Sequence, residues 1–221
     1  VTTLRVAGVV GCVGVVTIVR GQNAVAVRVA RHHRRGCVVV IAVVGGQRAV
    51  AIGIGAVEAL NARYAFPSSV RVMDGGTQGI FLLPWVCSAE RLLILDAVDF
   101  GMEPASLRLV RGDDVPCFMG AKKVSMHQAG FQEVLASADL TGSLPKELAL
   151  VGVQPELLDD YGGSLTSGVR ARIDEAVDVA CDVLRGWGIE PQPRSKPVSG
   201  VEHIGPTALD MQDYESGRPV I

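Results

Sequence analysis

The stretch Leu92-Leu93-Ile94-Leu95-Asp96, residues 92–96, decides the fold class of this chain. Four consecutive apolar residues that end in a carboxylate are typical of a central strand in a sheet covered on both faces. A shorter run, residues 70–73, ends at Asp74 in the same way. In open α/β sheets, ligands bind beyond the carboxyl ends of the strands. We therefore expect Asp74 and Asp96 to open onto one crevice.

The pattern around these two runs alternates between strands and helices. Strands are expected at residues 37–44, 107–110 and 148–153, helices at 127–140 and 169–187, the end of a helix at 58–64, and a further helix after the glycines at 75–76. Residues 112–120, which contain Pro116, are expected to form a loop. The alternation predicts an α/β fold: a twisted, mostly parallel sheet of about five strands with helices on both faces, in a single domain.

Composition excludes several classes of function. The net charge of −2 and the pI near 6.1 argue against nucleic-acid binding, which needs a concentrated basic face. Five cysteines without a CxxC pair are typical of reduced thiols in a cytoplasmic protein. The apolar run at residues 6–19 is too short and too rich in glycine for a membrane span. We therefore expect a cytoplasmic monomer with no membrane contact.

The first quarter of the chain is anomalous, because residues 1–57 contain no Asp, Glu or Lys. One interpretation is a signal peptide, with the apolar run between Arg5 and Arg20. Another is that much of residues 1–52 is translated in the wrong frame from GC-rich DNA, or forms a disordered arm. We expect three segments: a Val/Arg/Gly-rich N-terminal segment at 1–36, the α/β domain at 37–194, and a disordered tail at 195–221.

Asp96 and His127 are the candidate metal ligands. A carboxylate after four apolar residues needs a partner, solvent or a cation if it is buried, although it can also cap a turn. Ser125 resembles a helix N-cap and places His127 in the first turn of a helix, where a structural role is the alternative. Imidazole with carboxylate oxygens suits zinc or nickel.

The glycine-rich segment Asp74-Gly75-Gly76-Thr77-Gln78-Gly79 is a second candidate site. Its backbone N–H groups are suited to cradling an anion, but it lacks the Lys of a P-loop. The alternative is a tight turn in which glycines accept positive φ. Gly53-Ile54-Gly55 carries Glu58 where a dinucleotide turn needs a third glycine. A nucleotide- or small-molecule-binding α/β protein therefore remains an alternative.

Several blocks, taken in order and spacing, resemble the nickel-iron hydrogenase maturation endopeptidases. The blocks are Met73-Asp74-Gly75-Gly76-Thr77-Gln78-Gly79, Leu95-Asp96-Ala97-Val98-Asp99-Phe100-Gly101, Asp113-Asp114-Val115-Pro116, Lys123-Val124-Ser125-Met126-His127-Gln128 and Leu150-Val151-Gly152-Val153-Gln154-Pro155. The resemblance runs from about residue 56 to residue 193, well over half of the chain. It implies a twisted sheet between helices, in agreement with the pattern above.

The resemblance also implies a function. Members of this family remove a C-terminal extension from the hydrogenase large-subunit precursor after nickel has been inserted. The family's metal-contacting Asp and His match Asp96 and His127, and Asp74 matches the acid that opens its glycine-rich turn, which makes it a candidate catalytic group. The expected partner is the large-subunit precursor, and nickel arrives with that substrate. No organic cofactor is implied.

One family residue has no counterpart here. The family has a Gly-x-Gly-Asn turn after its first strand and then an Asp-Glu pair, whose Glu contacts the metal. The matching positions hold Ala51 and Ile52 or, without a gap, Ala49 and Val50. Replacing a carboxylate ligand by an alkyl group lowers metal affinity. A catalytically impaired homologue that only binds the precursor is therefore the first alternative.

Overall fold

The computed structural model describes residues 2–7, 13–20, 25–30, 36–42, 50–75, 79–120, 126–156 and 165–196. Its centre is a five-stranded sheet, in agreement with the prediction. The strands in spatial order are β6 (Val70–Asp74), β4 (Val38–Ala42), β7 (Arg91–Ala97), β9 (Glu147–Val153) and β8 (Leu107–Arg111). The first four are parallel, and β8 runs antiparallel to β9. The mostly parallel α/β architecture is therefore confirmed.

Strands β4 and β7 are inner strands of the sheet, and both of their faces are covered. Every residue of β4 is at most 1% exposed. Val38, Val40 and Ala42 belong to one apolar cluster, whereas Val39 and Ile41 belong to another. A strand that alternates between two apolar layers has no need for polar residues, which explains its continuous β-branched run. The two layers are formed by different helices.

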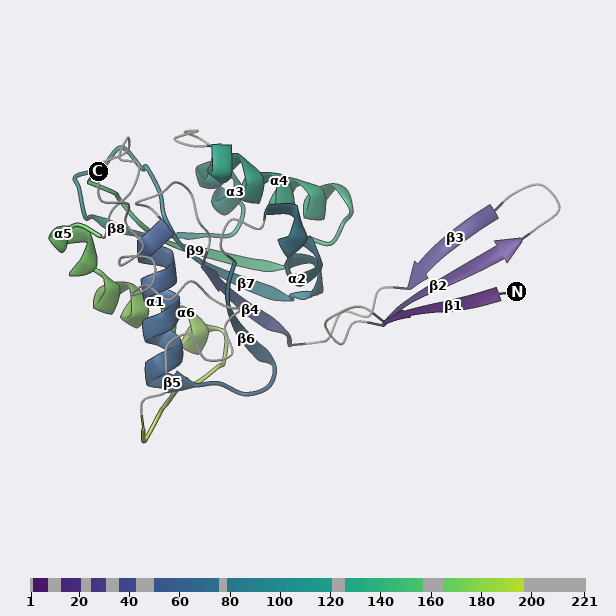
Figure 1. The fold of residues 1–221 in the computed structure, drawn as a ribbon, viewed down its shortest axis with the longest axis horizontal. Helices are drawn as coiled ribbons and strands as arrows, with labels where there is room; N and C mark the ends of the chain where they lie inside the picture. The colour runs from purple at the N-terminus through teal and green to yellow at the C-terminus, as the bar shows by residue number, and fades with distance from the viewer. Residues whose placement is uncertain are drawn as a thin grey trace, which may run out of the picture.

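Helices cover both faces of the sheet (Figure 1). Helices α1 (Val50–Arg63) and α6 (Ile173–Gly186) pack together on one face. The other face is covered by the short helices η1 (Gly79–Leu82) and α2 (Leu83–Ser88) and by α4 (Met126–Leu140). These elements confirm the helices expected after the glycine-rich turn and from residue 127. Among the described helices, none combines the length and hydropathy needed to cross a bilayer.

Two local predictions were wrong. The segment expected as a loop at 112–120 contains helix α3 (Asp114–Gly120), whose Val115 is fully buried. Pro116 is compatible with this helix because it lies in the first turn, where a backbone N–H needs no helical partner. The single helix expected at 169–187 is split into α5 (Ser167–Arg170) and α6. Val169 packs in a third cluster with Leu165, against which Ile173 at the start of α6 also packs.

Two small sheets complete the described structure. Strands β1 (Thr2–Ala7), β2 (Val13–Arg20) and β3 (Val25–Ala30) form an antiparallel sheet that pairs with no described strand of the central sheet. Strands β5 (Tyr64–Ala65) and β10 (Gln192–Pro193) pair with each other. The tail expected at 195–221 lies outside the described residues from 197 onward. The proposed segment boundaries stay predictions.

Candidate active site at the carboxyl edge of the sheet

The candidate site is built around the carboxyl end of β4. Ala42, the last residue of β4, pairs with Asp74 of β6 on one side and with Leu95 of β7 on the other. Asp96 follows Leu95 directly. Both acidic residues that the sequence singles out are buried, with exposed fractions of 8% for Asp74 and 2% for Asp96. Two neighbours of β4 thus bring one carboxyl group each to the same edge.

The pleat of the sheet places these two side chains on opposite faces. Ala42 and Leu95 belong to the apolar cluster under α1 and α6. Side chains paired across a parallel ladder share a face, so Asp74 lies on the α1 face. Asp96, one residue beyond Leu95, lies on the face of Ile94, which is covered by α2 and α4. Asp74 and Asp96 therefore share the carboxyl edge of the sheet but not its face, and the crevice between them stays a prediction.

Asp96 is a buried carboxyl group with one oxygen left without a partner. Its Oδ1 accepts a hydrogen bond from the backbone N–H of Ala97 at 2.7 Å. Its Oδ2 is buried and has no hydrogen-bond partner among the described residues. Burial raises the pKa of Asp96 well above its ordinary value, and the Ala97 amide offsets only part of that rise. No described basic side chain pairs with this carboxyl group.

This arrangement fits a metal ligand. A buried polar atom without a partner carries a free-energy cost of about 1–3 kcal/mol, and an unpaired buried charge costs more. A divalent cation at Oδ2 would satisfy the oxygen and favour the ionised form. The alternative reading of Asp96 as a turn cap explains Oδ1, which bonds the next amide, but leaves Oδ2 unexplained. The orphaned oxygen therefore supports the metal assignment of Asp96.

His127 occupies the position that the sequence predicts, in the first turn of α4. Its side chain, and Ser125, lie outside the described residues. Helix α4 covers the face that contains Asp96, because Phe131 and Val134 pack in the same cluster as Ile94. The chain continues from α4 to the start of β9, so the first turn of α4 points toward the carboxyl edge. His127 and Asp96 thus belong to one face and one edge.

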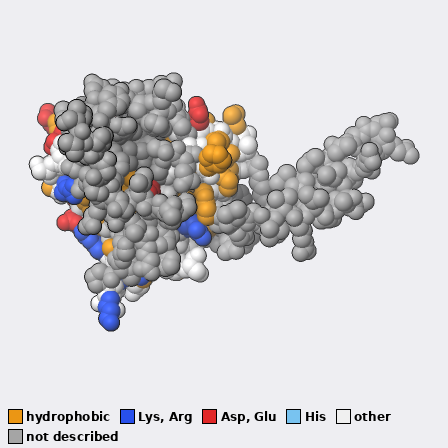
Figure 2. Space-filling model, in the orientation of Figure 1, with side chains coloured by type: hydrophobic (Ala, Val, Ile, Leu, Met, Phe, Trp, Pro, Cys, Tyr) orange, Lys and Arg blue, Asp and Glu red, His pale blue; other side chains and the backbone are white. Residues whose placement is uncertain are grey.

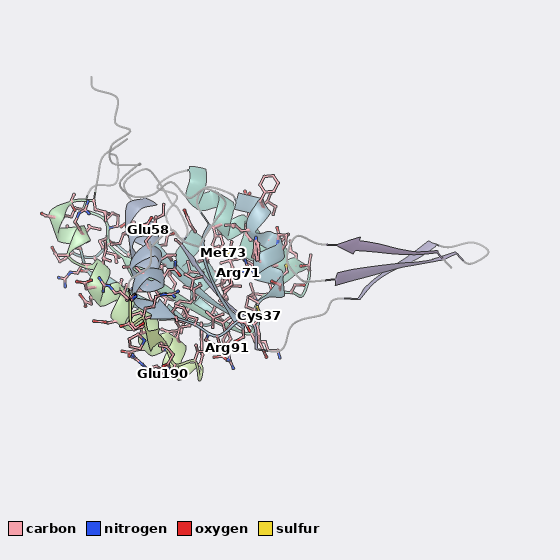
Figure 3. All side chains as sticks on the ribbon, turned by 60° about the horizontal axis from the view of Figure 1, so that its bottom comes forward. Cys37, Glu58, Arg71, Met73, Arg91 and Glu190 are labelled. Atoms are coloured by element: carbon pink, nitrogen blue, oxygen red, sulfur yellow. The ribbon has the colours of Figure 1, made fainter. Side chains whose placement is uncertain are left out.

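The start of α1 carries no acid. Helix α1 begins at Val50, and Ile52 is 1% exposed in an apolar cluster with Ala97 and Val153. Glu58 is the first acidic residue of the chain; it lies on α1 (Figure 3), about 12 Å along the helix axis from Val50 at 1.5 Å per residue. It therefore does not replace the missing carboxylate at the helix start. Among the described residues, no three potential metal-binding side chains converge.

The glycine-rich turn begins with a close backbone approach. The N–H of Gly75 donates to the carbonyl oxygen of Ala42 at 2.9 Å. A Cβ atom at Gly75 would lie 2.6 Å from that oxygen and 2.8 Å from the side chain of Ile41. Only glycine fits there, which accounts for the first glycine without an anion. Residues 76–78 lie outside the described residues, so the anion cradle stays a prediction.

Gln154 is a site residue that the pattern analysis did not single out. It is 5% exposed and follows the last residue of β9. Its Oε1 accepts from the N–H groups of Phe100 and Met102 at 2.8 and 3.2 Å. Its Nε2 donates to Asp99 Oδ1 at 3.1 Å. Gln154 thus fixes the loop that follows Asp96. The sequence pattern that identified Asp96, a polar residue directly after an apolar run, could also have identified Gln154.

Comparison with known proteins agrees with this architecture. The family model described as "Hydrogenase maturation protease" matches residues 54–183. The hydrogenase expression/formation protein HupD of Bradyrhizobium diazoefficiens is 48% identical over 163 residues, which cover 74% of this chain and 85% of that protein. HoxM of Azotobacter vinelandii is 50% identical over 167 residues, covering 76% of this chain and 79% of its own.

A solved structure supports the same assignment. The hydrogenase maturating endopeptidase HybD from Escherichia coli has a TM-score of 0.66 and 38% sequence identity, covering 71% of this chain and 98% of that one. The proteins of this group are peptide hydrolases of hydrogenase maturation. The family-model match begins just after the start of α1, so it includes Asp74, Asp96 and His127 but not the positions of the missing acid. The chain belongs to the hydrogenase maturation protease family.

Proposed function

We propose that this chain removes the C-terminal extension of a nickel-iron hydrogenase large-subunit precursor, and that Asp96 and His127 contact the nickel already seated in that precursor. The family makes peptide hydrolysis on such a precursor the expected reaction. The observation that carries the nickel contact is Oδ2 of Asp96, a buried carboxylate oxygen without a described partner. We further propose that the protein acts as a cytoplasmic monomer, without nucleic acid, membrane or organic cofactor.

The proposed roles follow from the positions of the side chains. Asp96 supplies a carboxylate oxygen, and His127 supplies an imidazole nitrogen from the first turn of the helix above the same face. Together they hold the cleavage segment of the precursor at the carboxyl edge, where the bound cation polarises a carbonyl or a water. Asp74 approaches the edge from the opposite face and is our candidate for the group that accepts the proton of the attacking water.

The experiment that tests this function uses precursor with and without nickel. The chain is incubated with each form, and loss of the C-terminal extension is followed by mass spectrometry. Processing of the nickel-loaded form alone supports the proposal. Asp96→Ala and His127→Ala are each expected to abolish processing while leaving the circular-dichroism spectrum unchanged. If either variant cleaves at the wild-type rate, the role assigned to that residue is wrong.

A second candidate function is binding of the precursor without cleavage. It is favoured by the absence of a carboxylate near the start of α1. Residues 1–57 contain no acidic side chain, and the buried residue near the start of α1 is Ile52. With only two of the family's three ligands, the cation is held less firmly. Binding of the nickel-loaded precursor without loss of its extension would support this candidate. Absence of any interaction would favour a small-molecule-binding protein instead.

A further inference from the structure

The exposed apolar side chains of this protein are not scattered evenly. Among the described residues, four large hydrophobic side chains are exposed: Ile80 (52%), Phe81 (77%), Met102 (43%) and Leu140 (88%). Single exposed apolar residues are ordinary on protein surfaces, whereas a group of them around one site marks a contact surface. The positions of these four therefore matter more than their number.

Three of the four flank the candidate site. Ile80 and Phe81 lie on η1, which follows β6 and Asp74 after the glycine-rich turn. Met102 lies in the loop that follows β7 and Asp96, and its N–H is held by Gln154 at the end of β9. These three residues, here called the apolar rim, stand on either side of the two acids along the carboxyl edge. Leu140 ends α4, from which the chain leads to the start of β9 at the opposite edge.

The rim is anchored and not a frayed end. Leu82, directly after Phe81, is 1% exposed and packs in the cluster that contains Ile94 and Phe131. Helix η1 also contacts α4, the helix whose first turn contains His127. Figure 2 shows hydrophobic side chains gathered on the surface in the area where Figure 1 labels α2, the helix that continues from η1. Ile80 and Phe81 are therefore held in place beside α4, whose first turn contains His127.

We propose that the apolar rim is the surface on which the folded hydrogenase large-subunit precursor docks, so that its cleavage segment reaches Asp96. This inference rests on the proposed function. If Asp96 contacts nickel that is seated in the precursor, the folded body that holds this nickel must cover the carboxyl edge. A specific protein interface buries about 800 Å² on each partner, with about 20–30 residues a side. An interface centred on Asp74 and Asp96 includes η1, which starts five residues after Asp74.

The rim also has the composition that such a contact uses. Aromatic residues and Met are enriched at the centres of interfaces, and a few of them carry most of the binding free energy. Phe81 is the largest of the three and the most exposed of them. We therefore expect it to be the principal anchor, with Ile80 beside it and Met102 across the site.

The test compares polar substitutions of exposed apolar residues at the two edges of the sheet. Binding of nickel-loaded precursor is measured by biolayer interferometry for the wild-type chain, for the double variant Ile80→Ser/Phe81→Ser and for Leu140→Ser. The rim variant is expected to raise Kd by at least about tenfold, whereas Leu140→Ser, which makes the most exposed of the four side chains polar at the opposite edge, leaves Kd unchanged. Thermal unfolding confirms that both variants fold, because all three side chains are exposed. Where turnover is measurable, KM rises and kcat at saturating precursor does not change.

Other outcomes overturn the proposal in distinguishable ways. If the wild-type chain neither binds nor processes the precursor, the proposed function fails, and the docking surface fails with it. If the wild type binds and the rim variant binds equally well, the function stands and the docking surface is wrong. If the wild-type chain is a dimer that the rim variant converts to a monomer without changing Kd, the rim joins two copies of this chain instead.

Discussion

Asp74, the last residue of β6, and Asp96, the last residue but one of β7, lie on either side of β4, and the pleat places their carboxyl groups on opposite faces of the sheet. The pair is therefore not a carboxylate dyad that shares one proton. Asp96 shares its face with the helix that carries His127, whereas Asp74 shares its face with α1. A substrate at this edge meets the two acids from different sides, and this separation allows one of them to hold a cation while the other accepts a proton.

Replacing Asp96 by Asn separates charge from shape. Asparagine retains an oxygen for the Ala97 amide but supplies no anionic ligand at the second position. We expect Asp96→Asn to reduce processing of nickel-loaded precursor by at least about 100-fold, since loss of a metal ligand removes the contact outright. Single-turnover assays measure the effect. A variant with wild-type turnover would show that the carboxylate charge is not used.

The same substitution predicts a change in the pH dependence of stability in metal-free protein. The pKa of Asp96 is raised by burial, so the folded state binds its proton more tightly than the unfolded state does. The contribution of Asp96 therefore falls as pH rises from the unfolded value, about 3.9, through the raised folded value. We expect Asp96→Asn to gain stability relative to wild type across that window. Urea unfolding at several pH values, with a chelator present, measures this difference, and a difference independent of pH would contradict it.

Introducing a glutamate near the start of α1, where the family has one, is expected to have opposite outcomes at two nearby positions. Ile52 is 1% exposed against Ala97 and Val153, so Ile52→Glu buries a charge and is expected to lower the free energy of unfolding by several kcal/mol. Val50 is the first residue of α1, where a carboxylate is favoured by the helix dipole. Val50→Glu is therefore expected to fold and to bind nickel-loaded precursor more tightly than wild type does. Thermal unfolding and precursor binding of both variants decide this.

The sequence predicts the strands of this fold well, because a buried parallel strand leaves a continuous apolar run. Asp96 was singled out as a candidate metal ligand because it directly follows such a run. The relative faces of Asp74 and Asp96 were not predictable, since they depend on the register that pairs Ala42 with Asp74 and Leu95. Helix α3 was missed because proline signals a loop unless its place in the first turn is known. The apolar rim leaves no pattern either, because exposure is decided by packing that the sequence does not display.

Gly75 and Gly186 provide a matched pair of glycine substitutions. A Cβ at Gly75 meets the Ala42 carbonyl at 2.6 Å, whereas one at Gly186, the last residue of α6, meets nothing within 4 Å. Gly75→Ala is expected to destabilise the protein by about 1–3 kcal/mol through overpacking. Gly186→Ala is expected to stabilise it by about 0.5–1 kcal/mol, as in other helices. Urea unfolding measures both changes, and a destabilised Gly186→Ala would contradict the assigned cause.

The N-terminal sheet is expected to be dispensable for the α/β body. None of the strands β1, β2 and β3 pairs with a described strand of the central sheet. The first N-terminal group with a described role in that body is the N–H of Gly36, which donates to Glu90 Oε2. A chain that starts at Arg34 retains this bond. We expect it to unfold at the same temperature as the full chain. A fall of more than a few degrees would show that residues 1–33 contribute to the fold.

Gln154 is expected to control the loop beside Asp96. Its amide oxygen accepts from Phe100 and Met102, and its amide nitrogen donates to Asp99. Gln154→Ala removes all three of these hydrogen bonds and is expected to cost about 1–3 kcal/mol of stability. Gln154→Glu keeps the acceptor for the two amides but replaces the donor with a carboxylate that faces Asp99.

The two Gln154 variants should therefore differ in their pH dependence. In Gln154→Glu, two carboxylates face each other, so its stability is expected to rise as pH falls and one of them gains a proton. Gln154→Ala introduces no such pair, and its loss is expected to be the same at each pH. Amide hydrogen exchange at Phe100 measures the loop directly. It should accelerate in Gln154→Ala at every pH and in Gln154→Glu mainly at neutral pH. Unchanged exchange in both would show that Phe100 is held by its packing against Gly152 and not by Gln154.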